Sequence, residues 1–339
     1  MHAAQGRRAL RASVAAVATA LSWTHAQAQE DKASAYPRKP VRILSSSIQG
    51  GGTDVVARMA AQGLSDRSGR AVVVDNRPGG AGILAMDVTR QAAPDGYTLL
   101  VTAASLMSTA TILKRVSYDV RTGFDPVAQL TIQPYLLVVH PSLPVKSVQE
   151  LIAYAKARPG ALNYASTGPG SASHLGTELF SARAGIKMVH ISFKSAGPAL
   201  IEILGGRDQF VFFSSVISAA PHVKNGGLRA LAVSSSKRSR AFPELPTIQE
   251  GGVRGFELNN WYGCFAPRGT PAPIVSRLNR LMYEIMNSPE MVTRLDAAGA
   301  EAAPALSPQE FGRALVDEVE LWDKFIRSSG LKDVLIESN

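Results

Sequence analysis

Cysteine is almost absent from this chain: among 339 residues, only Cys264 carries a thiol. A lone cysteine cannot form an internal disulfide, so we expect an apolar core to hold the fold and Cys264 to be buried as a small apolar side chain. Histidine is also sparse, with six residues and no H-E-x-x-H motif. The sequence therefore predicts neither a disulfide framework nor a metal site.

The motifs of nucleotide-binding proteins and of elbow-type hydrolases are missing as well. Gly50, Gly51 and Gly52 follow an apolar run, but the Lys-Ser or Lys-Thr of a phosphate-binding P-loop does not follow at its spacing. No G-x-G-x-x-G pattern is present, and no G-x-S-x-G surrounds a serine. We therefore expect no cofactor and no enzymatic activity. A periplasmic serine hydrolase assembled from distant cleft residues stays open as an alternative.

Apolar runs long enough to span a membrane, about 18 residues, are absent after residue 28. Before it, arginines within residues 7–11 precede a small-apolar stretch over 12–23, and residues 26–28 form an A-x-A cleavage site. This order is typical of a secretory signal, so we expect cleavage after Ala28 and a mature chain in the bacterial periplasm, exported by the general or the twin-arginine route. Residues 29–35 read as a polar tether.

Acidic residues are outnumbered by basic ones. The formal net charge is +9, and it falls to +6 when the three arginines of the predicted signal are removed. A surplus of this size favours an acidic ligand, although solubility alone explains it equally well. Binding to nucleic acid or to a membrane surface is a further alternative, but the sequence has no basic run interleaved with aromatic residues, so we expect no nucleic-acid partner.

Strand-like and helix-like segments alternate along the mature chain, which is typical of α/β proteins with parallel sheets. Strands are expected over 41–44, 71–74, 97–102, 135–139, 162–165, 189–193, 210–213, 228–233 and 261–265. Helices are expected from 53, after 82, over 148–157, from 175, over 197–204 and in a tail from 271 that packs on the first lobe. The length predicts two α/β lobes, residues 36–138 plus 260–339 and residues 139–259, with a ligand cleft between them.

Two glycine-rich loops are predicted to bind an anion in that cleft. The first is Gly50–Gly52, whose glycines let the backbone approach a ligand at the N-terminus of a helix. Thr53 is expected to cap that helix, either as its only role or while also offering its hydroxyl to the ligand. Asp54 is expected to face away from the bound anion. The second loop, 167–174, contains Ser171 or Ser173 as a cap, and its histidine packs, hydrogen-bonds to backbone or contacts the ligand.

Three further pairs lie at the ends of expected strands and are candidates for the same cleft. Lys194 could reach an acid group, with Ser195 beside it, although an exposed lysine is the common outcome. Ser214 and Ser215 end another strand. Residues 261–262, Trp-Tyr, either cover a small ligand or are buried against the helical tail.

Several motifs occur together and in order over nearly the whole mature chain. They are GGGTDVVAR at 50–58, VVVDNRPGGAG at 72–82, APDGYTLL at 93–100, the stretch 140–175 and LRALAVSS at 228–235. Together they resemble the Bug (TctC-like) family of periplasmic solute-binding proteins. The resemblance implies a type II periplasmic binding protein-like α/β fold and a receptor that captures small carboxylates for the permease subunits of a tripartite tricarboxylate transporter. We expect a monomer. A ligand-sensing receptor that signals to a membrane sensor is the alternative.

The resemblance places the first ligand loop at residues 49–54 and the second at 166–174. The candidate ligand-binding residues are Ser47, Gln49, Gly51, Gly52, Thr53, Ser166, Thr167, Gly170, Ser171, Ser173, His174, Lys194, Ser195, Ser214 and Ser215. The chain departs from the family pattern at Ser46-Ser47, where Pro-Phe is usual, at Ser195, where glycine is usual, and at Ser214-Ser215, where Asp-Asn is frequent. We therefore expect a more polar pocket, less suited to a ligand with an amino group.

Overall fold

A computed structural model describes residues 36–79, 82–103, 107 and 116–329. The signal predicted over 1–28 and the tether over 29–35 lie outside these residues. The strands are β1 (Val41–Ser45), β2 (Val72–Asn76), β3 (Thr98–Ala103), β4 (Phe124–Val139), β5 (Asn163–Ser166), β6 (Val189–Ser192), β7 (Phe210–Ser215), β8 (Arg229–Val233), β9 (Asn259–Pro267) and β10 (Glu301–Ala302). The helices are α2 (Gly52–Ser68), α3 (Ile83–Arg90), α5 (Val120–Gly123), α6 (Val148–Ala157), α7 (Ala172–Ala184), α8 (Ala196–Leu204), α9 (Val216–Lys224), α10 (Ala272–Met286), α11 (Pro289–Ala298) and α12 (Pro308–Ser329).

Local sequence signals set the ends of several helices. Gly69 ends α2 in the left-handed conformation, with φ 64°. Ser147 begins α6 by accepting a hydrogen bond from the backbone N–H of Glu150, whose carboxylate in turn accepts from the N–H of Lys146. The predicted α/β class is confirmed, and the predicted strands and helices lie close to the observed ones.

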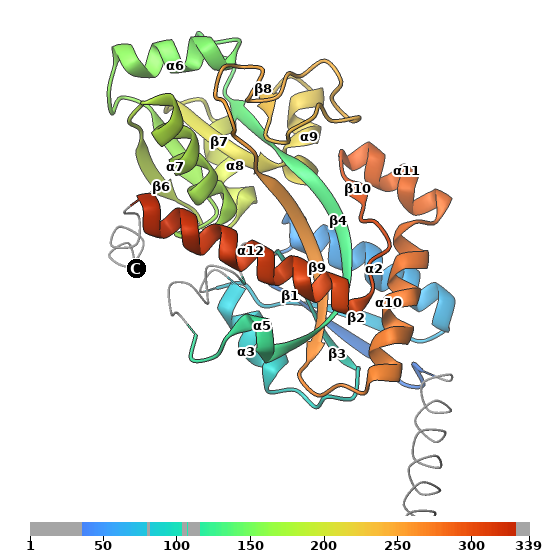
Figure 1. Ribbon diagram of the computed structural model, residues 1–339. Helices are drawn as coiled ribbons and strands as arrows, with labels where there is room; N and C mark the ends of the chain where they lie inside the picture. The colour runs from blue at the N-terminus through green and yellow to red at the C-terminus, as the bar shows by residue number, and fades with distance from the viewer. Residues whose placement is uncertain (1–35, 80–81, 104–106, 108–115, 330–339) are drawn as a thin grey trace, which may run out of the picture.

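The strands follow the order β2-β1-β3-β9-β4-β7-β5-β6, with β8 and β10 pairing with β4. Pairing is parallel among β1, β2 and β3 and again among β5, β6 and β7, whereas β4 and β9 are antiparallel to their neighbours. Figure 1 shows β4 and β9 running together through the middle of the molecule, from the β1–β3 side to the β5–β7 side. These two long strands join the two groups of parallel strands.

The sequence reading missed most of β4. A strand was expected from 135, but β4 begins at Phe124 and pairs with β9 up to Pro134 before pairing with β7 and β8. Pro126 and Pro134 disfavour a strand, and β4 accommodates the first of them beside a register shift between Pro126 and Ala128. The lobe boundaries at 138/139 and 259/260 stay a prediction.

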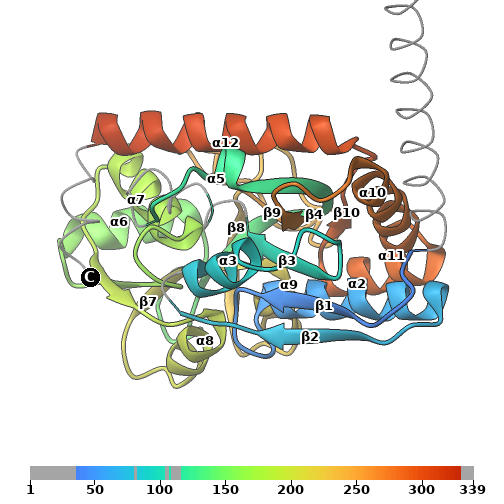
Figure 2. The same cartoon turned by 90° about the horizontal axis from the view of Figure 1, so that it is seen from below.

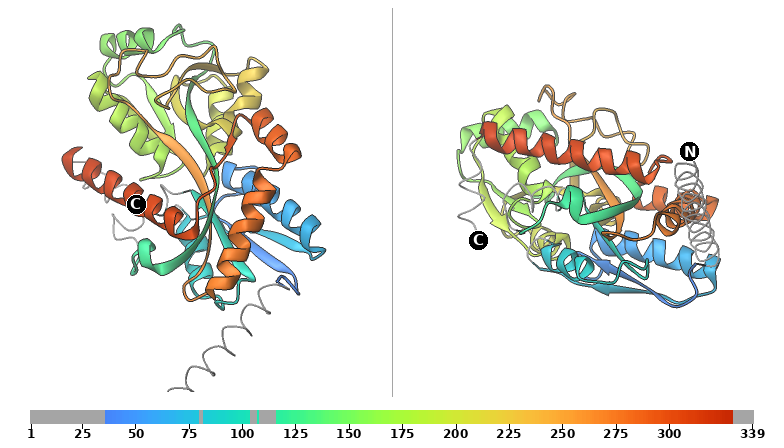
Figure 3. Two further views of the ribbon diagram at one scale, coloured as in Figure 1. Left: turned by 45° about the vertical axis from the view of Figure 1, so that its right-hand side comes forward. Right: turned by 60° about the horizontal axis from the view of Figure 1, so that its bottom comes forward.

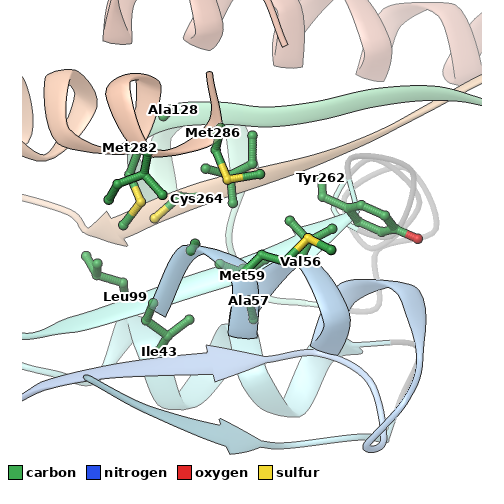
Figure 4. Packing of buried hydrophobic residues seen from close by; sticks show 14 of the residues in the cluster. Ile43, Val56, Ala57, Met59, Leu99, Ala128, Tyr262, Cys264, Met282 and Met286 are labelled. Carbon is green, nitrogen blue, oxygen red and sulfur yellow. The ribbon is translucent and has the colours of Figure 1, made fainter. Parts of the chain in front are cut away.

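One part of the apolar core lies between the β1–β3 side and helices α2 and α10. Figure 4 shows Met59, Met282 and Met286 around Cys264, while the hydroxyl of Tyr262 points away from them at the edge of the cluster. Cys264 is fully buried, as expected, and burial raises the pKa of its thiol to about 12. The ring of Tyr262 therefore belongs to the core, while its hydroxyl points out of the core.

Helix α12 packs differently from the expectation that the tail lies on the first lobe alone. Phe311 and Leu315 lie in a core cluster with Leu44 of β1, whereas Trp322 and Ile326 lie in a cluster of the β5–β7 side. Figures 2 and 3 show α12 extending along the molecule past both groups of strands. The tail thus packs on both sides, not on the first alone, because its 22 residues make a helix of about 33 Å.

Candidate functional site

A cavity of about 860 Å³ lies where the carboxyl ends of the parallel strands of both sides meet. Its lining includes Ser46 and Ser47 after β1, Ala103 at the end of β3, Thr167 after β5 and Ser215 at the end of β7. Ligands of open α/β sheets bind at this edge, and the volume is within the range of small-molecule sites. The cavity is therefore the candidate ligand site.

Among the helices that the structure describes, five begin at this cavity. The N-cap residues of α2, α3, α7, α8 and α9 all line it, namely Gly51, Gly82, Ser171, Ser195 and Ser215. Each helix N-terminus presents backbone N–H groups without helical partners and the positive end of the helix dipole. The sequence predicted two such helices, and their number strengthens the preference of the cavity for an anion.

The charged groups at the cavity reinforce this preference. Lys194 lines the cavity, and no aspartate or glutamate does so within the described part of the chain. The described residues also contain no group of three or more His, Cys, Asp or Glu side chains that could hold a metal ion. Apart from Lys194, the polar lining consists of serine and threonine hydroxyls, Asn260, Tyr135, Tyr262 and backbone.

The first loop (residues 47–54) is held from behind by Asp54. This buried carboxylate accepts hydrogen bonds from Gly50 N–H (2.9 Å), Asn76 Nδ2 (2.8 Å) and Arg58 Nε (3.0 Å). Burial alone would raise the pKa of Asp54, but the hydrogen bonds and the charge of Arg58 hold it below its usual value. Asp54 lies outside the cavity lining, as expected, and acts as the anchor of the loop.

The capping role expected of Thr53 was wrong. Helix α2 begins at Gly52 with Gly51 as its N-cap, so Thr53 is already in the first turn. Ser47 Oγ instead accepts from the N–H of Asp54 at 3.1 Å. Thr53 still lines the cavity, which leaves its hydroxyl available on that side of the loop.

Gly52 allows a close approach between the two sides of the cavity. A Cβ atom at Gly52 would collide with Tyr262 Oη and lie 3.2 Å from Ser215 Oγ. Tyr262 also hydrogen-bonds to the side chains of Ser215 and Asn260, and burial raises its pKa. The first loop thus meets β9 and the start of α9 at the inner end of the cavity.

The second loop (residues 166–174) uses hydroxyls for its caps. Ser171 is the N-cap of α7 and accepts from the N–H of His174 at 3.4 Å. Ser173, the other candidate cap, accepts instead from the N–H of Thr167 at 3.0 Å. Both serines and Thr167 line the cavity.

Two stacked histidines support this loop from outside the cavity. His174 Nδ1 accepts from the N–H of Gly170 at 3.0 Å, and its ring lies 4.0 Å from that of His190. His190 Nε2 lies 2.7 Å from Ser166 Oγ, which also accepts from the N–H of Gly168. Burial lowers the pKa of His190 to about 4, so this imidazole is neutral near pH 7. The sequence reading did not single out His190.

The structure divides the predicted site residues into two groups. Those that line the cavity are Ser47, Gly51, Gly52, Thr53, Thr167, Ser171, Ser173, Lys194, Ser195 and Ser215. Those outside the described lining are Gln49, Ser166, Gly170, His174 and Ser214. Gln49 is exposed, whereas Ser214 is fully buried and its side chain alternates away from that of Ser215 along β7.

Other lining residues were missed. They include Ile48, Gly79, Gly82, Ile83, Tyr135, Phe193, Phe212, Ser218 and Asn260. The segment before α3 carried a usable signal, because β2, a glycine-rich stretch and a helix follow one another there as they do after β1. Tyr135 and Asn260 carried none, since they reach the cavity only through the pairing of β4 with β7 and of β4 with β9.

Residues 56–331 match the family model described as tripartite tricarboxylate transporter family receptor, TctC. The chain belongs to this family. It is 37% identical over 302 residues to Protein BugT of Bordetella pertussis, covering 88% of this chain and 92% of the relative. The resemblance to Bug and TctC receptors is thereby confirmed.

Solved TctC-type structures share its fold. Rpa4515 of R. palustris with adipate matches with a TM-score of 0.83 at 35% identity, over 87% of this chain and 98% of that chain. MatC of Rhodopseudomonas palustris with bound malate matches with a TM-score of 0.80 at 30% identity, over 86% and 100% of the two chains. The periplasmic binding protein-like fold is therefore confirmed. Within the described residues, no helix has the length and apolarity to cross a membrane.

Proposed function

We propose that this TctC receptor binds a small carboxylate in the 860 Å³ cavity and delivers it to the permease subunits of a tripartite tricarboxylate transporter. The observation that carries the proposal is the convergence of five helix N-termini on a cavity whose described lining contains no acidic side chain. Two related structures hold adipate and malate, which are both carboxylates. The protein acts as a monomeric periplasmic receptor, and no bond of the ligand is made or broken.

The two loops supply the contacts in this proposal. Backbone N–H groups of Gly52 and Thr53 and the hydroxyls of Thr53 and Thr167 face a carboxylate from both sides, and Ser173 holds Thr167 in place. Charge-assisted hydrogen bonds of this kind are stronger than those between neutral groups. Closure of the lobes 36–138 plus 260–339 and 139–259 about β4 and β9 then removes water from the ligand.

The alternative of a serine hydrolase has little support. Ser166 Oγ and His190 Nε2 lie 2.7 Å apart, which is the distance expected between a nucleophile and its general base. However, Ser166 is fully buried outside the described cavity lining, and its Oγ already accepts from Gly168 N–H. The pair supports the second loop, so it serves binding in this proposal.

A thermal-shift screen followed by calorimetry tests the proposal. Purified mature protein is screened against mono-, di- and tricarboxylates and against neutral compounds of similar size, because a ligand that binds only the folded state raises its melting temperature. We expect carboxylates to stabilise the protein. Stabilisation by neutral compounds alone would show the proposal to be wrong.

Variants then locate the site. Thr53→Ala combined with Ser173→Ala is expected to weaken binding of the best carboxylate by about tenfold or more. Thr53→Ala removes one hydrogen bond to a charged group, which contributes about 1.5–3 kcal/mol, and Ser173→Ala removes the support of Thr167. Thr53→Ser keeps the hydroxyl and serves as the matched control. Unchanged affinity of the double variant would place the ligand elsewhere.

A further inference from the structure

Seven large apolar side chains are exposed in the part of the chain that the structure describes: Val73, Leu84, Val189, Ile191, Ile201, Tyr283 and Leu321. The first five lie at matching places on the two sides of the sheet. They are on its two end strands, β2 and β6, and on the helix that follows each end strand, α3 and α8. We call these five the rim residues; the other two lie on α10 and α12.

The rim residues of the end strands are exposed for the same reason on both sides. Val73 of β2 is paired with Arg42 of β1 and therefore lies on the face of the sheet where Leu44 packs in a cluster with α3. Ile191 of β6 is paired with Ala165 of β5, which packs in a cluster with α8. Helix α3 packs mainly on β1, β3 and β9, and α8 mainly on β5, β7 and α9. Each helix therefore leaves the end strand beside it largely uncovered.

The rim residues also flank the ligand cavity. The N-cap residues of α3 and α8 line it, and so do Gly79 and Phe193, which lie just after β2 and β6. Figure 2 shows β2 and α8 along the side of the molecule opposite α12. A protein that contacts β2–α3 and β6–α8 at once would touch both sides of the cavity. Since ligand-driven closure changes the separation of these two sides, such a partner can distinguish the liganded receptor from the empty one.

Positive charge surrounds the rim residues. Between residues 182 and 201 the chain contains three basic residues and no acidic one. Two of them, Lys187 and Lys194, flank β6, are exposed and take part in no ion pair among the described residues. On the other side of the cavity, Arg42 and Arg77 share a single carboxylate, that of Asp75. A complementary partner therefore carries acidic side chains.

The same charges disfavour a second copy of this chain as the partner. Antiparallel pairing of two β6 edges centred on His190 and Ile191 would place Lys187 of one copy opposite Lys194 of the other, and like charges in that position are destabilising. We propose that the rim residues form the docking surface for a permease subunit whose periplasmic face presents apolar side chains flanked by aspartate or glutamate. This inference rests on the proposed function, in which the receptor delivers its carboxylate to such a subunit. The apolar contacts supply affinity, and the opposite charges speed association and fix orientation.

Uptake by cells whose own receptor gene is deleted tests the docking surface. The cells retain the permease, receive wild-type or variant receptor, and are given the radiolabelled carboxylate that binds most tightly in the thermal-shift screen and calorimetry. Val73→Asp and Ile201→Asp, one on each side of the cavity, are expected to reduce uptake by about tenfold or more, because each places a charge in an apolar interface flanked by acidic residues. Their carboxylate affinity and melting temperature should match the wild-type values, since both side chains are exposed and neither lines the cavity.

Leu321→Asp is the matched control. Leu321 is 61% exposed, against 57% for Val73 and 72% for Ile201, but it lies on α12, so uptake should be unchanged. Lys187→Glu should reduce uptake by about threefold and Lys187→Arg should not, because only the first reverses the charge. Wild-type rates of uptake with Val73→Asp and Ile201→Asp, or an equal loss with Leu321→Asp, would overturn the docking surface.

Analytical ultracentrifugation separates the permease from a second copy as the partner. The wild-type receptor is expected to sediment as a monomer, and a dimer that Ile201→Asp dissociates would show that a second copy covers the rim residues. The proposed function has a different point of failure. If the wild-type receptor restores no carboxylate uptake, delivery to a permease is wrong and the docking surface is overturned with it. Wild-type uptake that the rim variants leave unchanged contradicts the docking surface alone.

Discussion

The loop at residues 47–54 is held by a buried carboxylate, whereas the loop at 166–174 is held by serine hydroxyls and two stacked imidazoles. Both present helix N-termini to one cavity. The anchors differ in their response to acid: Asp54 keeps its charge down to low pH, but His190 gains a proton once the pH approaches about 4. The two loops, which both face the cavity, should therefore lose their supporting contacts at different pH values.

The largest effect is expected at the anchor of the first loop. Asp54→Asn removes a buried charge that accepts from Gly50, Asn76 and Arg58, and it should lower the free energy of unfolding by about 3 kcal/mol. Urea unfolding measures this change. Asp66→Asn is the matched control, since Asp66 is exposed and accepts from Gln62 on the same helix. Equal, small losses in both variants would mean that the Asp54 network does not hold the loop.

An intermediate effect is expected where the first loop meets β9. Gly52→Ala forces a methyl group onto Tyr262 Oη, and overpacking of this kind costs about 1–3 kcal/mol. Carboxylate affinity should fall as well, because the loop must shift. Tyr262→Phe removes the obstructing oxygen, so the Gly52→Ala/Tyr262→Phe pair should be more stable than the two separate losses predict. Strict additivity in a double-mutant cycle would contradict the close approach.

The smallest effect near pH 7, a change of slope at lower pH, concerns the second loop. His190 has a pKa of about 4 when folded against an ordinary value of 6.5, so the unfolded chain binds more protons between these values. The free energy of unfolding should therefore decrease as the pH falls from about 6.5 to about 4. His190→Phe keeps a stacked ring but cannot titrate, and its profile should be flatter over this window in chemical denaturation.

For comparison, the Asp54 carboxylate loses its stabilising contribution as the pH falls from the ordinary value of 3.8 towards its folded pKa, which lies lower. The His190→Phe profile should therefore be flatter than the wild-type profile until that lower range is reached, where both proteins lose stability together. A variant as steep as the wild-type protein between pH 6.5 and 4 would show that the imidazole is not the cause.

Short-range patterns were enough to predict where the two loops lie. A strand, small residues and a helix start are neighbours in sequence, so Gly51 and Ser171 could be placed at helix N-termini from local spacing alone. The supports of the loops depend on pairing between distant segments. His190 reaches Ser166 because β6 pairs with β5, and Tyr262 reaches Gly52 because β9 pairs with β3. No local pattern encodes either pairing.

The same reason explains the errors at Thr53 and in β4. Thr53 was recognised as a residue type that can cap a helix. Whether it does so depends on where the chain turns into α2, and that turn makes Gly51 the N-cap and brings Ser47 Oγ to the N–H of Asp54. In β4, Pro126 and Pro134 disfavour a strand locally. The long antiparallel partner β9, which is more than 100 residues away, overrides them.

The position of β9 bears on the order in which the chain can assemble. β9 lies between β3 and β4, yet it is synthesised after β5, β6, β7 and β8. As the chain lengthens, β1, β2 and β3 are available early, but β3 has only β1 beside it until its second neighbour, Asn259–Pro267, has been made. The β5–β7 side has all of its strands by Val233. The half of the molecule that begins first is consequently the half that is completed last.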